Sequence, residues 1–259
     1  MNLLGSFFRS SIGRKVIMAV TGLVLFGFVI GHLTGNLQIF QHPDRINGYA
    51  QFLHNLGPML WVARIGLLVA VVLHIWAATA LTIENRQARG PENYAVRTWL
   101  RATISSRYVR WTGYIVAAFI VYHLAHFTFG ATDPADFKGQ HRYVMQDDYA
   151  MFGLPAIKAG TEVGNVYLMV YRGFESVPVS IFYIVAVGLL SLHLLHGVDS
   201  VFQTFGLRSE QWGGALRRLV AVICVLYFVG NLAIPAAIVT GLLKPHPAAQ
   251  VHGPASAAR

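Results

Sequence analysis

Hydrophobic residues in this chain are gathered into five runs of about 20 residues, with polar segments between them. An α-helix rises about 1.5 Å per residue, so a run of this length crosses the roughly 30 Å hydrocarbon core of a bilayer. The pattern predicts an all-α integral membrane protein with five transmembrane helices in a single membrane domain, residues 1–259. The expected spans are 16–39, 59–83, 111–129, 178–205 and 219–243, followed by a disordered tail at 244–259.

Composition supports the membrane assignment. The chain is 55% hydrophobic and only 12% charged, with a mean hydropathy of +0.51, which is outside the range of soluble domains. The only cysteine, Cys224, lies in a hydrophobic run, so neither an internal disulfide nor a cysteine-ligated cluster is expected. Arg9, Arg14 and Lys15 lead into a full-length span without a small-residue cleavage site, which indicates a retained first helix.

The distribution of basic residues predicts the orientation. The N-terminus and the second and fourth connections hold 3, 6 and 3 of the 20 Lys and Arg residues. By the positive-inside rule, the N-terminus is cytoplasmic and the C-terminus lies outside. The net charge of +9 largely reflects this bias, so nucleic acid is not an expected partner, whereas membrane lipid is. The longest connection, 130–177, is polar and mixed in charge, as expected of a small cap at the membrane surface.

Histidines recur inside the apolar runs, where ionisable groups are costly and mark function. They are His32, His74, the pair His123 and His126, and the pair His193 and His196. Counting residues from the membrane surface places His32 and the histidines of the third span in the outer half or near the middle. The same count places His74 and the histidines of the fourth span in the inner half. Two histidine pairs at two depths are therefore expected.

Two stacked histidine pairs are typical of a two-haem b-type cytochrome, in which imidazoles from facing helices clamp each porphyrin. Such a six-coordinate haem has no open position for substrate and serves electron transfer. A zinc site is less consistent with the pattern, because the pairs differ in depth and the spans lack a carboxylate or thiolate to complete either site. Depth alone does not choose between His123 and His126, or between His193 and His196.

Three segments resemble a known family: SSIGRKVIMAVTGLVLFGFVIGHLTGNL, INGYAQFLHNLGP and HLLHGVDSVFQTFGL. They are similar to the cytochrome b membrane subunit of succinate dehydrogenase and fumarate reductase, in particular the b558-type family with five helices and two haems. The similarity extends over nearly all spans. The resemblance implies two haem b groups, the outer one held by His32 and His123 and the inner one by His74 and His193. It also implies that His126 and His196 lie beside the ligands, and that Ser191 replaces a glutamate linked in some fumarate reductases to proton return.

The resemblance further implies partners and location. A flavoprotein subunit would oxidise succinate and an iron–sulfur subunit would pass electrons to the inner haem, both on the cytoplasmic face of a bacterial inner membrane. The succinate chemistry would not lie in this chain. Its own contribution would be docking, a haem relay and a quinone site, with menaquinone favoured.

Polar residues near the spans are candidates for the remaining roles. Arg64, inside the second span, is at the depth of an outer-haem propionate, although it can also snorkel to the surface. Inner-face cations available to a propionate are Arg14, Lys15, Arg97, Arg101, Arg107 and Arg110. Quinone reduction needs a proton-capable group beside an apolar slot. The candidates on the outer side are Asn36, Gln38, Tyr49, Gln51 and His54, whose alternative role is helix capping.

Two other functions compete with a succinate:quinone oxidoreductase anchor. The same anchor can serve a quinol:fumarate reductase, because direction depends on the quinone potential and the catalytic subunits. A histidine-lined metal or ion transporter would bind no haem, and its histidines would line one continuous polar path. Internal repeats are also expected of a transporter, and none is evident in the sequence.

Overall fold

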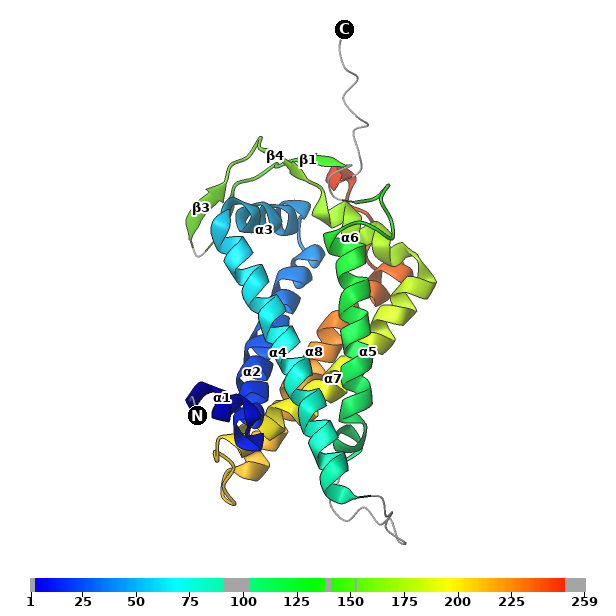
Figure 1. Cartoon of the computed structure of the whole chain (residues 1–259). Helices are drawn as coiled ribbons and strands as arrows, with labels where there is room; N and C mark the ends of the chain where they lie inside the picture. Colours follow the sequence, from blue (N-terminus) through cyan, green and yellow to red (C-terminus); the bar gives the residue numbers. More distant parts are fainter. Residues whose placement is uncertain (1–2, 91–102, 138–140, 152, 250–259) are drawn as a thin grey trace. The chain divides into compact units, whose positions relative to one another are not determined.

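The computed structural model describes residues 3–90, 103–137, 141–151 and 153–249, and these are predominantly helical (76%) (Figure 1). Within this described part, four helical segments are long and apolar enough to cross a membrane: Ser11–Phe40, Pro58–Arg89, Val177–Thr204 and Gly213–Val239. The expectation of a helical, multi-pass membrane protein is confirmed at this level.

The long helices begin and end close to the expected spans. They are α2 (Ser11–Asn36, continued by the 3₁₀ turn η1, Leu37–Phe40), α4 (Pro58–Arg89), α5 (Ile104–His123), α7 (Val177–Thr204) and α8 (Gly213–Val239). A short α1 (Leu3–Arg9) precedes them. Gly57, at φ +54°, makes the turn into α4, and Gly206, at φ +70°, follows α7. Both positions need the left-handed conformation that glycine adopts without a steric penalty.

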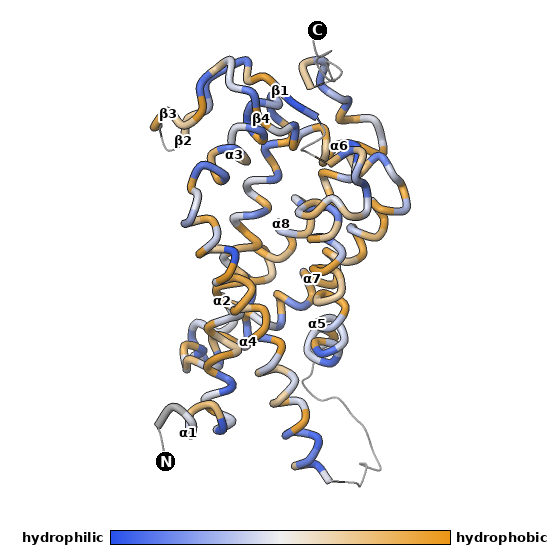
Figure 2. Tube along the Cα trace, turned by 45° about the horizontal axis from the view of Figure 1, so that its top comes forward, coloured by the Kyte–Doolittle hydropathy of each residue, from blue (hydrophilic) through white to orange (hydrophobic). Residues whose placement is uncertain are grey.

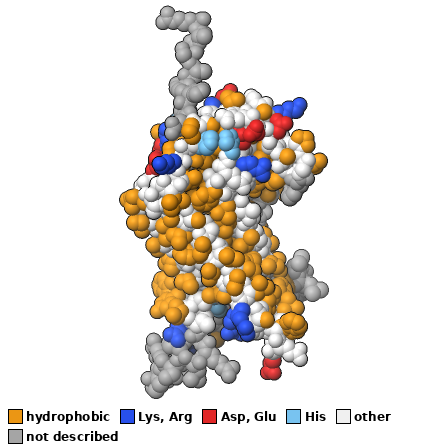
Figure 3. Space-filling view, turned by 180° about the vertical axis from the view of Figure 1, so that it is seen from behind, with side chains coloured by type: hydrophobic (Ala, Val, Ile, Leu, Met, Phe, Trp, Pro, Cys, Tyr) orange, Lys and Arg blue, Asp and Glu red, His pale blue; other side chains and the backbone are white. Residues whose placement is uncertain are grey.

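The surfaces of these helices are apolar. Trp61, Val121 and Leu226 are 61%, 69% and 64% exposed, which would be unfavourable in water. Figure 2 shows hydrophobic residues predominating along the long helices, and in Figure 3 hydrophobic side chains make up most of the helical surface drawn. Such a surface indicates contact with lipid.

Helix α5 differs from the other long helices. It has 20 residues, and Arg107 and Arg110 lie in its first two turns, so it is not among the four spanning candidates. The segment after it, Leu124–Thr128, is a π-helix. The expected third span, 111–129, is therefore the second part of α5 plus this π-helical turn. Five spans, and the direction in which they cross, remain predictions.

Contacts between residues divide the chain into two compact units. The first comprises 1–30, 63–115 and 189–226, and the second comprises 31–62, 116–188 and 227–259. Each unit contains pieces of α2, α4, α5, α7 and α8. The single membrane domain expected for residues 1–259 remains a prediction.

In the second unit, the long connection forms a cap over the helix α3 (Pro43–Asn55). Its elements are β1 (Arg142–Val144), β2 (Tyr149–Met151), β3 (Leu154–Ile157), β4 (Glu162–Gly164) and α6 (Val166–Glu175). Antiparallel pairs join β1 to β4 and β2 to β3. The cap has its own apolar core, of Tyr143, Met145, Tyr149, Ile157 and Val163. These short strands are an addition to the expected all-α architecture.

Part of the expected tail is ordered. Residues 247–249 form the turn η3, and Ala249 is buried, with its carbonyl accepting a hydrogen bond from Asn165 Nδ2 at 3.0 Å. Asn165 also caps the N-terminus of α6 by accepting from the Leu168 N–H. This contact connects residues just after α8 to the cap. The rest of the expected tail, 250–259, lies outside the described residues.

Candidate functional site

His74 and His193 face each other within the first unit. They extend from α4 and α7, and their ring centroids are 6.3 Å apart with the ring planes at 70°. Both side chains are half-buried. The structure thus brings together the two histidines expected as the inner pair.

The Nδ1 atom of His74 is held by α2. It lies 3.1 Å from the Met18 carbonyl oxygen and 3.2 Å from Thr21 Oγ1. Thr21 donates its only hydroxyl hydrogen to the Ile17 carbonyl at 2.7 Å, so its oxygen is free to accept from the imidazole. A carbonyl and an accepting hydroxyl require a hydrogen on Nδ1. The lone pair of this imidazole is therefore on Nε2.

The Nδ1 atom of His193 is held in the same way by α5. Thr112 Oγ1 is 3.3 Å away and donates its own hydrogen to the Val109 carbonyl at 3.0 Å. The Val109 backbone also interacts electrostatically with His193. Both histidines of this pair thus use Nδ1 for the protein and keep Nε2 as an acceptor or metal ligand.

His32 and His123 form the second pair, within the second unit. Their ring centroids are 5.6 Å apart and the planes are nearly perpendicular, at 88°. His123, the last residue of α5, is surrounded by rings, including Phe119, Phe127 and Tyr183. His123 therefore lies in an aromatic environment.

The neighbouring histidines have other contacts. His126 is buried in the π-helix, where its Nδ1 lies 3.0 Å from the Tyr183 hydroxyl and its ring stacks on Phe127. His196 lies one turn after His193 and contacts Ser200 Oγ at 3.3 Å. Depth alone does not choose between His123 and His126, or between His193 and His196. In the structure, His123 faces His32, and His193 faces His74.

The spacing of both pairs fits an iron atom between the rings. A metal–imidazole bond of about 2 Å on each side, with the nitrogen about 1 Å from its ring centre, places two ligating rings about 6 Å apart. The observed separations, 5.6 and 6.3 Å, lie on either side of this value. Among the described residues, no group of three or more His, Cys, Asp or Glu side chains is arranged to hold a metal ion. This part of the chain offers two sites of two histidines each, and a haem, which brings the rest of its iron ligands with it, would fit such a site.

The candidate propionate partners that the structure describes lie in α2, α4 and α5. Arg64 is exposed on α4. Arg14 is paired with Glu84 and lies over the Trp76 ring at 6.0 Å, so its charge is already partly compensated. Lys15, Arg107 and Arg110 lie in α2 and α5, whereas Arg97 and Arg101 fall outside the described residues.

The quinone candidates lie at the end of α2, in η1 and along α3, and Tyr49 of α3 contacts the helix that carries His32. The Tyr49 ring packs on Gly35 of α2, three residues after His32, so closely that a Cβ at Gly35 would lie 2.6 Å from Tyr49 Cε1. Gln51 donates to Asn55 Oδ1 at 2.8 Å, and His54 is exposed on the same helix. Asn36 and Gln38, at the end of α2 and in η1, are half-buried.

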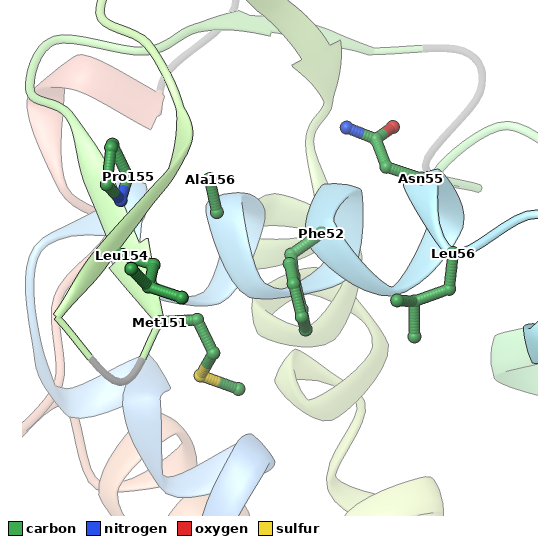
Figure 4. Close-up of a pocket in the computed structure, with 7 residues that line it drawn as sticks. All are labelled: Phe52, Asn55, Leu56, Met151, Leu154, Pro155 and Ala156. Atoms are coloured by element: carbon green, nitrogen blue, oxygen red, sulfur yellow. The ribbon is translucent and has the colours of Figure 1, made fainter.

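An open cleft of about 400 Å³ lies beside these residues (Figure 4). One side is lined by Phe52 and Asn55 of α3 and by Leu56, which follows the helix. The other side is lined by Met151, Leu154, Pro155 and Ala156 of the β2–β3 hairpin. The cleft is mainly apolar, with the Asn55 amide as its polar group.

Sequence reasoning missed a buried carboxylate that organises this end of the second unit. Asp44, 3% exposed, accepts hydrogen bonds from the Tyr143 hydroxyl at 2.8 Å and from the backbone N–H groups of Gln146 and Asp147 at 3.0 Å each. Burial, and then the hydrogen bond to Asp44, raise the pKa of Tyr143. The signal in the sequence was the His-Pro-Asp start of α3, in which His42 is the N-cap and its Nδ1 lies 3.0 Å from Asp44 Oδ2.

None of the family models, curated proteins or solved structures compared with the chain matches it.

Proposed function

We propose that this chain is the membrane-anchor cytochrome b subunit of a succinate:quinone oxidoreductase. It would relay electrons from an iron–sulfur subunit, through two bis-histidine haem b groups, to a quinone. The observation that carries this proposal is the pairing of four intramembrane histidines, two by two, at separations suited to an iron atom between them. The resemblance of the three sequence segments supplies the identity of the complex.

The chemistry of the site supports electron relay. A haem with two imidazole ligands has no open coordination position, so it exchanges electrons without binding substrate. His74 and His193 contribute Nε2 because their Nδ1 atoms are engaged by the protein. His32 and His123 would contribute the imidazoles of the other pair, and aromatic rings pack around His123. The apolar helices keep both sites at low dielectric.

The arrangement in the membrane follows from the same proposal. The chain would cross a bacterial inner membrane five times, with α5 and the π-helical turn as the third span and the N-terminus in the cytoplasm. The pair His74 and His193 would then be the inner one, next to a flavoprotein and an iron–sulfur subunit bound at the basic face. The pair His32 and His123 would be the outer one.

The quinone would be reduced near the outer pair. Tyr49 is the best placed proton donor, because its ring rests on Gly35 near His32. The cleft between α3 and the β2–β3 hairpin supplies apolar surface for the quinone, with the Asn55 amide as a polar contact. Menaquinone is favoured by the resemblance.

Haem analysis of the purified membrane complex tests the proposal. A pyridine haemochrome assay should give two haem b per chain, and succinate should reduce the haem in the complex with its two soluble subunits. A purified, folded chain without haem would refute the cytochrome function and favour the histidine-lined transporter. The quinol:fumarate reductase would be favoured if, with quinol as donor, fumarate oxidised the haem rapidly while succinate reduced it poorly.

A further inference from the structure

Two helices hold a histidine with the same three-part arrangement, here termed a histidine seat. It consists of a backbone carbonyl, a threonine three residues later and a glycine four residues later. The seats are Met18, Thr21 and Gly22 in α2, which hold His74, and Val109, Thr112 and Gly113 in α5, which hold His193.

The helix geometry explains why these three positions work together. Side chains in a helix lean toward the N-terminus, so each residue covers the carbonyl four positions before it. Glycine at the fourth position leaves that carbonyl open to an approaching ring. A Cβ on Gly22 would lie 3.1 Å from His74 Cε1, and one on Gly113 would lie 3.3 Å from His193 Cε1. Both are tighter than ordinary van der Waals contacts.

The threonine completes each seat. Its hydroxyl hydrogen goes back to a carbonyl of its own helix, Ile17 for Thr21 and Val109 for Thr112. Each threonine oxygen can then only accept from the imidazole. We propose that the two seats fix the Nδ1–H tautomer and the ring orientation of His74 and His193, so that both Nε2 atoms are presented to one haem iron. Thr21 and Thr112 are then positioning residues, and this assignment rests on the proposed haem function.

The seats also have a sequence signature. Thr21 and Gly22 are followed by His32 with nine residues between, and Thr112 and Gly113 are followed by His123 with the same interval. Eleven residues are close to three turns of helix, so the threonine and the later histidine share one helix face. Helices α2 and α5 therefore have equivalent roles, each giving a seat to one histidine pair and a ligand to the other.

This arrangement predicts an effect confined to one haem. Both seats act on the pair His74 and His193, and the seats and this pair all belong to the first unit. Hydrogen bonds from Nδ1–H make an imidazole ligand more basic, which favours the oxidised metal. Removing the acceptor should raise the midpoint potential of the haem held by His74 and His193, and leave the other haem unchanged.

The test uses Thr21→Val and Thr112→Val, which keep the β-branched shape and remove the hydroxyl. Thr204→Val is the matched control, because Thr204 in α7 makes the same back-bond to a helix carbonyl, Ser200 O at 2.9 Å. In the purified complex, a redox titration should show one component shifted upward in either seat variant and neither shifted in the control. Low-temperature electron paramagnetic resonance should show an altered signal for the same haem, because the imidazole planes are released.

Conservative replacement separates positioning from packing. Thr21→Ser and Thr112→Ser retain the hydroxyl and should restore the potential and the resonance signal. The assigned role of the seats would be refuted if the midpoint potentials of both haems shifted equally. It would also be refuted if the titrations of both valine variants were identical to that of the wild type. A shift that serine does not restore would also refute it, because packing would then be the cause.

A measurement on the haem-free chain tests the role of the seats independently of the proposed haem function. In the haem-free chain labelled with ¹⁵N-histidine, His74 and His193 should carry hydrogen on Nδ1, and Thr21→Val should change the signal of His74 alone. A chain that binds no haem but shows these tautomers would refute the cytochrome and retain the seats. A haem-binding chain whose His74 carries hydrogen on Nε2 in the haem-free state would refute the seats.

Discussion

Replacing Tyr143 by phenylalanine tests how strongly the Asp44 carboxylate stabilises the cap. The substitution removes one hydroxyl, which donates to Asp44 Oδ1 at 2.8 Å, and both side chains are 3% exposed. A hydrogen bond to a charged group contributes about 1.5–3 kcal/mol, so Tyr143→Phe should lower the free energy of local unfolding by about that amount.

Hydrogen exchange gives a direct measure of this loss. The N–H groups of Gln146 and Asp147 donate to the same carboxylate, so they report its order. Each 1.4 kcal/mol corresponds to a tenfold change, so their protection should fall roughly 10- to 100-fold in the variant.

Tyr149→Phe is the control for the same assay. Tyr149 is also buried, but among the described residues its hydroxyl is bonded to the Met151 sulfur alone, at 3.6 Å, so its loss should cost much less. Protection of Gln146 and Asp147 that is unchanged in Tyr143→Phe, or reduced equally in Tyr149→Phe, would refute the assigned role of Asp44.

Three further predictions follow from named contacts. Burial and Asp44 raise the pKa of Tyr143 above that of a free tyrosine, so the stability that this group contributes is complete below about pH 10 and is lost as the pH rises further. The difference between the 295 nm absorbance titrations of the wild type and Tyr143→Phe should show a tyrosine that ionises late. Ionisation at the pH of a free tyrosine would contradict this. Gly35→Ala places a Cβ 2.6 Å from Tyr49 Cε1 and should lower the free energy of thermal unfolding by about 1–3 kcal/mol. The double variant Gly35→Ala, Tyr49→Ala should relieve the clash. Additive losses of stability in the double variant would exclude the contact. Tyr49→Phe should reduce quinone reductase turnover about 100-fold with the haem content unchanged. Tyr114→Phe, at an exposed position of α5, is the control and should have no effect. Full activity in Tyr49→Phe would show that Tyr49 is not the proton donor.

The long helices were predictable from sequence because about 20 consecutive apolar residues leave few alternatives in a bilayer. The histidine pairs were predictable to within one helical turn, since residue counts give depth but not direction around the helix. His123 and His126 are nearly equivalent by depth, and the π-helical turn after His123 rotates His126 toward Tyr183. That local change of helix type has no clear signal in the sequence.

The cap was less predictable. Its strands are three or four residues long, too short for an alternating pattern to stand out. Its organising residue, Asp44, lies about 100 positions before the groups that donate to it, so only the folded chain brings them together. The histidine seats were missed for a related reason: a Thr-Gly pair in an apolar run is ordinary until the structure shows an imidazole resting on it.

Potentiometric titration of four single variants shows whether the four histidines act as two specific pairs. His32→Ala, His74→Ala, His123→Ala and His193→Ala would each be titrated optically in the purified complex, with His126→Ala and His196→Ala as matched neighbours. His32→Ala and His123→Ala should lose the same haem component, His74→Ala and His193→Ala should lose the other, and the two neighbouring variants should retain both. Loss of the same component in His32→Ala and His74→Ala, or retention of both components in any of the four, would refute this pairing.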